Sequence, residues 1–293
     1  MTRLLLTTAI FATIAWRADA TVLFPSGATA QIMIGDTPHA GTTAETFTVT
    51  QGTSASGSFS AANSSGAASA DLTTGLLHLS TTGTSTPSMT VDPFEFLVFS
   101  GSGTVSYSMQ LDGTLLNSSA NGDASISGGV YFYDETGFTS PYFSTQSSGS
   151  ENVTNGYLPT ASAGITDVLY GSSYPTTDLP INFGNFLVNE VQNNSGTAVS
   201  FSPDITGSVN VQAGHLYIIQ LLLTAGDDQL SGSSLQTVNF ANTAAFDFTN
   251  LDGLTVTSSS GQFLSNVAPE PGTLLLLGSG LFVTIFAARR RLL

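Results

Sequence analysis

Apolar and polar residues alternate with a period of two along much of this chain of 293 residues. In residues 103–113 the apolar positions are Val105, Tyr107, Met109 and Leu111. The same period occurs in residues 45–50 and 205–212, where the apolar positions are Phe47, Val49, Ile205, Val209 and Val211. Because successive side chains of a β-strand point to opposite faces, each segment is predicted to be a strand with one buried and one solvated face.

Longer apolar runs occur at residues 94–99, 129–134 and 215–223, and Gly, Ser, Asn and Asp surround them. We expect these runs to be central strands. Few stretches show a helical period. The pattern therefore predicts an all-β fold, an antiparallel β-sandwich of jelly-roll-like form in which two sheets bury their inner faces against each other.

Three low-complexity stretches, residues 53–70, 118–129 and 144–156, are rich in Ser, Ala, Gly and Asn. Such composition predicts loops or loosely held sheet edges. We expect one domain over residues 21–265. The alternative is a pair of smaller sandwiches that divide near residue 160.

The N-terminus has the order of a secretory signal peptide over residues 1–20. Arg3 supplies a basic start, residues 4–15 form an apolar core, and Ala18 and Ala20 are the small residues of a signal-peptidase site. Cleavage after Ala20 is expected, and the alternative is an uncleaved anchor. Both interpretations predict export of the chain.

The C-terminus contains an uncharged apolar run, Thr273 to Ala288, followed by Arg289, Arg290 and Arg291. At about 1.5 Å per residue the run is roughly 24 Å long as a helix, a short span for a bilayer core of about 30 Å. Flanking arginines extend the reach by snorkelling. The sequence thus predicts a transmembrane helix at 273–288 with the arginines on the cytoplasmic side and the preceding chain outside.

The order of Pro269, Glu270 and Pro271, then the apolar run, then Arg289 to Arg291 resembles the PEP-CTERM sorting signal of Gram-negative bacteria. The resemblance covers residues 266–293. It implies recognition by exosortase, a membrane enzyme inferred to cut near the Pro-Glu-Pro triplet, and delivery from the inner membrane to the cell surface and exopolysaccharide. The alternative is a plain C-terminal anchor in which the triplet is accidental.

Residues 214–264 are also similar to a pattern common just ahead of this signal. A Gly-containing turn leads into an apolar strand, and a Phe-rich strand precedes a segment whose recurring residues are Gly253, Thr255, Val256, Ser258, Ser260 and Gly261. The resemblance implies that these are the closing strands of a sandwich.

Charge is distributed unevenly between the terminal segments and the exported part. The five basic residues are Arg3, Arg17, Arg289, Arg290 and Arg291, so residues 21–268 contain no Lys or Arg. The same residues contain eighteen of the twenty acids, since only Asp19 and Glu270 lie outside them. Nucleic-acid binding is therefore excluded, because it depends on basic side chains. The chain has no Cys, which excludes disulfides, thiolate catalysis and sulfur-ligated metals.

The remaining candidates for chemistry are carboxylates and three histidines. His39, His78 and His215 lack metal-ligand spacing, and His78 and His215 are expected to be half-buried strand residues. Carboxylates for glycoside hydrolysis would come from Asp134, Glu135, Glu151, Glu190, Asp227 and Asp228. Calcium ligands would come from these acids with Asn121, Asp123, Asn250 and Asp252, although no EF-hand order is present. No other cofactor is expected.

Two classes of function remain. The preferred one is a non-enzymatic surface or extracellular-matrix protein that associates with exopolysaccharide. The other is a carbohydrate-binding or carbohydrate-cleaving module on the cell surface. Its sugar-stacking candidates are the aromatic residues expected in loops: Tyr142, Phe143, Tyr157 and Tyr174.

Overall fold

A computed structural model describes residues 24, 29–36, 46–60, 63–84, 89–118, 123–136, 160–170, 186–192, 197–226 and 235–265. The predicted signal peptide, sorting motif and membrane helix lie outside these residues. No helix in the described part of the chain is long and apolar enough to cross a membrane.

The described elements are β-strands, which confirms the all-β prediction. They are β1 (Gln31–Asp36), β2 (Thr46–Gln51), β3 (Ser54–Ser60), β4 (Ser64–Asp71), β5 (Leu76–Gly83), β6 (Met89–Phe99), β7 (Gly103–Asn117), β8 (Asp123–Asp134), β9 (Ala161–Tyr170), β10 (Phe186–Gln192), β11 (Val199–Phe201), β12 (Asp204–Val211), β13 (Leu216–Gly226), β14 (Gln236–Asn250) and β15 (Val256–Ser258).

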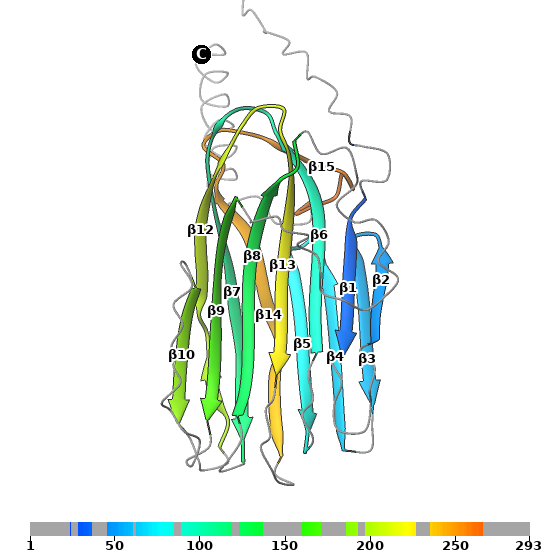
Figure 1. The fold of residues 1–293 in the computed structure, drawn as a ribbon, viewed down its shortest axis with the longest axis vertical. Helices are drawn as coiled ribbons and strands as arrows, with labels where there is room; N and C mark the ends of the chain where they lie inside the picture. The colour runs from blue at the N-terminus through cyan, green and yellow to red at the C-terminus, as the bar shows by residue number, and fades with distance from the viewer. Residues whose placement is uncertain are drawn as a thin grey trace, which may run out of the picture.

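The strands form two sheets that run along the long axis of the domain (Figure 1). Sheet A has the order β10-β9-β8-β13-β6-β1-β2, with β15 also paired to β6. Sheet B has the order β11-β7-β14-β5-β4-β3, with β12 also paired to β7. The pairs are antiparallel as predicted, except that β9 and β10 are parallel, with Phe186 opposite Gly164.

Strand alternation buries the predicted faces of β7 and β12. In β7, Val105, Tyr107, Met109 and Leu111 are at most 1% exposed. In β12, Ile205, Val209 and Val211 are buried while their neighbours face solvent. The prediction is wrong for Val49, which is 47% exposed. Val49 lies on β2, which is the edge strand of sheet A among the described strands.

The long apolar runs form central strands of sheet A, as predicted. β6 is buried along its whole length and lies between β13 and β1. Its inner face contributes to the core shared with sheet B, and its outer face carries Phe94 and Phe96. These two rings form a second cluster with Tyr133 and Ile218, against which Phe24 packs.

Two low-complexity stretches belong to strands, which corrects the expectation of loops. The expectation of a sheet edge holds for β3, the edge strand of sheet B, whereas β4 and β8 have neighbours on both sides. Residues 53–70 supply β3 and β4, and residues 123–129 begin β8. Their Ala residues still alternate inward, because Ala68 and Ala70 are buried in the core. Small residues are also required there, since a Cβ on Gly66 would lie 2.4 Å from the ring of Phe59. Residues 144–156 lie outside the described part.

Strands from both halves of the sequence alternate in the two sheets. β14 lies between β7 and β5, and β13 lies between β8 and β6. Their inner faces contribute to one hydrophobic cluster, whose aromatic centre includes Tyr107, Phe132, Phe246 and Phe248. Strands from before and after residue 160 therefore share this one cluster.

Antiparallel pairing places one set of turns at the same end of both sheets. Residues 72–75, 100–102, 135–136 and 212–215 lie at this end, together with residues 251–265, which appear at the top of Figure 1. We call residues 251–265 the closing segment and this end of the molecule the tail-proximal end. The opposite end, near residues 63, 84, 118 and 235, is the distal end.

Candidate functional site: the tail-proximal end

The closing segment begins directly after β14 and first joins sheet A. Its β15 pairs with the last residues of β6, with Val256 opposite Phe99. Just before β15, the Thr255 N–H donates to Ser100 Oγ at 2.9 Å, and the Ser100 N–H donates to the Thr255 carbonyl at 2.9 Å. The loop that follows β6 therefore holds the closing segment at two points.

The closing segment then crosses to sheet B. The Phe263 ring lies 6.0 Å from the ring of Phe246 and 6.2 Å from that of Phe248. The Leu264 N–H donates to the Leu72 carbonyl at 2.9 Å, next to the turn between β4 and β5. Because it contacts both sheets, the closing segment covers the core at this end.

A buried carboxylate fixes the crossing point. Glu95 is 0% exposed and lies opposite Ile219, on the face of β6 that points into the core. Its Oε1 accepts hydrogen bonds from Ser259 Oγ at 2.6 Å and from the Phe96 N–H at 2.9 Å, with a longer contact from the Ser260 N–H at 3.4 Å. A buried carboxylate is costly unless it is hydrogen-bonded, so the closing segment and Glu95 stabilise each other.

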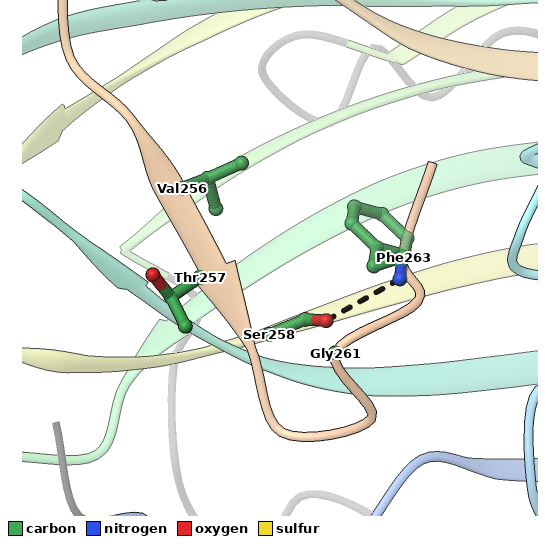
Figure 2. Close-up of a pocket in the computed structure, with 5 residues that line it drawn as sticks. All are labelled: Val256, Thr257, Ser258, Gly261 and Phe263. Carbon is green, nitrogen blue, oxygen red and sulfur yellow. Dashed lines mark hydrogen bonds between the residues drawn. The ribbon is translucent and has the colours of Figure 1, made fainter. Parts of the chain in front are cut away.

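A serine-lined bend follows β15 and forms a shallow hollow of about 160 Å³ (Figure 2). Its lining residues are Val256, Thr257, Ser258, Gly261 and Phe263. The Ser258 Oγ accepts from the Phe263 N–H at 3.3 Å and lies 3.2 Å from Ser260 Oγ. Gly261 has a φ of 65°, a left-handed conformation that favours glycine. Ser258, Ser260 and Gly261 of the closing pattern thus form the bend. The implied closing strands are β13, β14 and β15.

An aspartate–histidine pair lies at the same end, between β8 and β13. The His215 Nδ1 is 2.7 Å from Asp134 Oδ2, and both side chains are a little under one-third exposed. Asp134 Oδ1 accepts from the Thr136 N–H at 3.0 Å, and Thr136 Oγ1 accepts from the Leu216 N–H at 3.0 Å. Partial burial raises the pKa of Asp134, but hydrogen bonds from Thr136 and His215 outweigh it, so that its pKa is lowered overall.

Glu135 follows Asp134, and its pKa is shifted in the opposite direction. It is 6% exposed, and its N–H donates to the Leu216 carbonyl at 2.8 Å. Burial, and to a lesser degree the charge of Asp134, raises its pKa to about 7. Asp134 and Glu135 therefore hold their protons over different pH ranges, although they are neighbours in sequence.

The structure brings together Asp134, Glu135 and His215 from the predicted candidates. His215 precedes β13 and pairs with a carboxylate 81 residues away, a contact that no local sequence signal reveals. His78 is half-buried on β5, as predicted. In the turn after β14, the Asp252 N–H donates to Asn250 Oδ1 at 2.8 Å. No group of three or more His, Asp or Glu in the described ranges is arranged to hold a metal ion.

The other candidates lie outside the described residues or have side chains that are not described. The first group is His39, Asn121, Tyr142, Phe143, Glu151, Tyr157, Tyr174, Asp227 and Asp228, and the second is Asp123 and Glu190. Sequence reasoning missed Glu95, because an acid inside an apolar run gives no indication of its partner 164 residues away. The Ser-rich closing pattern, which contains Ser259, was the one sequence feature that pointed to this part of the site.

The fold and the tail-proximal end define the class of protein. It is an all-β protein in which the closing segment covers the core and is followed by a C-terminal signal. Residues 267–291 match the family model of the PEP-CTERM protein-sorting motif. The matched range begins two residues after Ser265 and includes Pro269, Glu270, Pro271 and the three arginines. This motif implies an exported protein that exosortase sorts at the membrane. No curated protein and no solved structure matches the chain.

Proposed function

We propose that this protein is a structural component of the cell surface or extracellular matrix that associates with exopolysaccharide and has no catalytic activity of its own. Signal peptidase removes residues 1–20, helix 273–288 anchors the intermediate in the inner membrane, and exosortase then processes the chain near Pro269–Pro271. The sorting motif directly after the closing segment carries this proposal. We also propose that the β domain has the jelly-roll-like connectivity expected from its sequence.

The surface of the β domain supports a scaffold role. Residues 21–268 contain no Lys or Arg, so the exported part has no basic side chain for phosphate backbones or anionic lipids. Ser, Thr and Asn side chains are frequent on the solvent-facing strands, as in the Thr104–Asn210 and Thr82–Thr237 contacts of sheet B. Hydroxyl and amide groups suit contacts with hydrated, neutral polysaccharide.

The second candidate, a carbohydrate-cleaving module, is favoured by one observation. Asp134 and Glu135 have pKa values shifted in opposite directions, which is the property of an acid–base pair in glycoside hydrolysis. However, Glu135 is buried, and the hollow of Figure 2 contains neither carboxylate. We therefore rank this function below the scaffold role. Lectin-like binding through Tyr142, Phe143, Tyr157 and Tyr174 remains the non-catalytic form of this alternative.

One experiment tests both functions. The exosortase-processed protein would be screened against a glycan panel and the producer's own exopolysaccharide, with chromatographic analysis of products. We expect association with exopolysaccharide and no product. Product formation that is lost in Glu135→Gln would overturn the structural role, and tight binding to one defined glycan would support a lectin.

Sorting is tested separately by replacing Pro269, Glu270 and Pro271 with Ala. In cells that contain exosortase, we expect the altered chain to accumulate unprocessed in the inner-membrane fraction. The unaltered chain in cells without exosortase is the matched control and should accumulate in the same fraction. Normal surface delivery of the altered chain would contradict this route.

A further inference from the structure

Both targeting segments join the β domain at or near its tail-proximal end. Phe24 packs against the cluster that contains Phe96 and Tyr133, near the ends of β6 and β8. At the other terminus, Leu264 is bonded to Leu72, and Ser265 is the last described residue. The predicted signal-peptidase site at Ala20 is four residues before Phe24, and Pro269 is four residues after Ser265.

The tether between the β domain and the bilayer is short compared with the domain itself. Seven residues, 266–272, lie between Ser265 and Thr273, where the apolar run begins, so the eight Cα–Cα steps of the tether reach at most about 29 Å when fully extended. β7 alone, with fifteen residues, is about 50 Å long. The bonds to Glu95 and Leu72 keep the closing segment from lengthening this tether.

Charge disfavours contact between the outer face of sheet B and the bilayer. The outer face of sheet B exposes Asp112, Asp204 and Asp247 on β7, β12 and β14. No Lys or Arg occurs in the described residues to attract anionic lipid headgroups. Contact of this face with an anionic bilayer would therefore be repulsive.

We propose that the tail-proximal end is the surface that faces the lipid bilayer while helix 273–288 is inserted. The strands then run roughly along the membrane normal, and the distal end points away from the membrane. This inference rests on the proposed anchoring of the sorting intermediate. It assigns the Asp134–His215 pair to the membrane side and leaves the distal turns as the part most accessible to matrix.

The absence of cysteine makes the orientation measurable with single labels. Three exposed positions report on it: Ala213 at the tail-proximal end, Gln110 midway along β7, and Asn63 at the distal end. Each would be replaced by Cys in the full chain, labelled with a small fluorophore, and reconstituted into phosphatidylcholine vesicles with and without an anionic lipid. A nitroxide on the lipid headgroup quenches fluorophores that lie near the surface.

We expect quenching to be greatest at Ala213→Cys, weaker at Gln110→Cys and close to the nitroxide-free value at Asn63→Cys. Equal quenching at the three positions, or more at Asn63→Cys, would overturn the proposed orientation. Vesicle flotation distinguishes this failure from failure of the anchoring step. A chain that does not float with vesicles contradicts both proposals, whereas one that floats without a gradient contradicts only the orientation.

A longer tether tests the cause of the gradient. Inserting a flexible Gly/Ser segment of about 20 residues after Ser265 would extend the reach beyond the length of β7. We expect the difference between Ala213→Cys and Asn63→Cys to shrink markedly. An unchanged gradient would show that the domain itself binds lipid, and would overturn the tether as the cause.

Discussion

At the scale of single residues, buried polar groups show where this fold depends on exact partners. Glu95 has one oxygen bonded to the closing segment, while its Oε2 has no hydrogen-bond partner among the described residues. The Tyr107 hydroxyl is similarly buried without such a partner, and burial raises its pKa to about 12. These groups are tolerated because the surrounding apolar contacts outweigh their desolvation.

The Glu95 contact predicts a selective effect of Ser259→Ala. The substitution removes the hydroxyl donor from a buried carboxylate, so the free energy of unfolding should fall by about 1.5–3 kcal/mol. Urea unfolding measures this loss, and amide exchange across residues 256–264 should accelerate with it. Thr257→Ala, at an exposed position on β15 two residues before Ser259, is the control and should change stability by no more than about 0.5 kcal/mol.

Glu135 predicts a pH dependence of stability. Its pKa in the folded protein is about 7, above the ordinary value of 4.5, so the folded state binds the proton more tightly. The contribution of Glu135 to the free energy of unfolding should therefore be complete below about pH 4.5 and decline as the pH rises through 7. The loss should be roughly 1–3 kcal/mol.

Urea unfolding at pH 5 and pH 8 checks this prediction with Glu135→Gln, which should remove the decline. Asp134→Asn should remove a pH dependence of stability that has the opposite sign. The lowered pKa of Asp134 gives a stabilisation that is lost only as the pH falls through that lowered pKa. The quantity to compare is the difference in free energy of unfolding between the unaltered protein and Glu135→Gln. If this difference were the same at pH 5 and pH 8, burial of Glu135 would not cause the pH dependence.

At the scale of elements, the sequence predicted those strands whose burial follows the order of apolar and polar residues within the strand itself. The alternation of β7 and β12 and the continuous apolar runs of β6 and β13 depend on local side chains, so their burial was predictable. The β3–β4 hairpin was not, because Ser, Ala and Gly carry little hydrophobic signal and are buried only through their neighbours. The parallel β9–β10 pair and the Asp134–His215 contact depend on topology, which no local pattern specifies.

The turn between β4 and β5 predicts a position where only glycine fits. Gly75 has a φ of 70°, and a Cβ there would lie 2.3 Å from the Phe246 carbonyl oxygen on β14. Gly75→Ala should therefore destabilise the protein by more than about 2 kcal/mol, from conformational strain and backbone displacement together. Thermal unfolding measures the change.

Gly214→Ala is the matched control for this prediction. Gly214 has a φ of 77°, but a Cβ there would meet nothing within 4 Å. Its cost should be limited to about 1–2 kcal/mol of left-handed strain. Equal losses in the two variants would show that the contact with β14 adds nothing.

At the scale of the whole molecule, stability comes from burial and strand pairing, with little contribution from pairs of opposite charge. Within the described residues the recorded ion pair is Asp134–His215, and the exported part has eighteen acids and no Lys or Arg. Like charges therefore repel across the surface. The large shared core and the long antiparallel ladders must offset this repulsion.

This imbalance predicts that salt stabilises the protein. Raising sodium chloride at pH 8 should increase the midpoint of thermal unfolding, because screening weakens the repulsion, with about 2–4 °C for each 1 kcal/mol gained. Calcium chloride at equal ionic strength separates screening from binding. A further increase with calcium would support the predicted calcium sites, and a decrease with sodium chloride would contradict the repulsion argument.

The closing segment also determines when the fold is completed. Phe263 and Leu264 cover a core built from strands that begin with β1, and Ser259 bonds to a residue 164 positions earlier. Non-local contacts of this kind form late and slowly. In the proposed export route the chain is translocated N-terminus first, so this part of the core stays uncovered until residues 259–264 emerge. In that route the uncovered end of the core is exposed to aggregation until the closing segment packs against it.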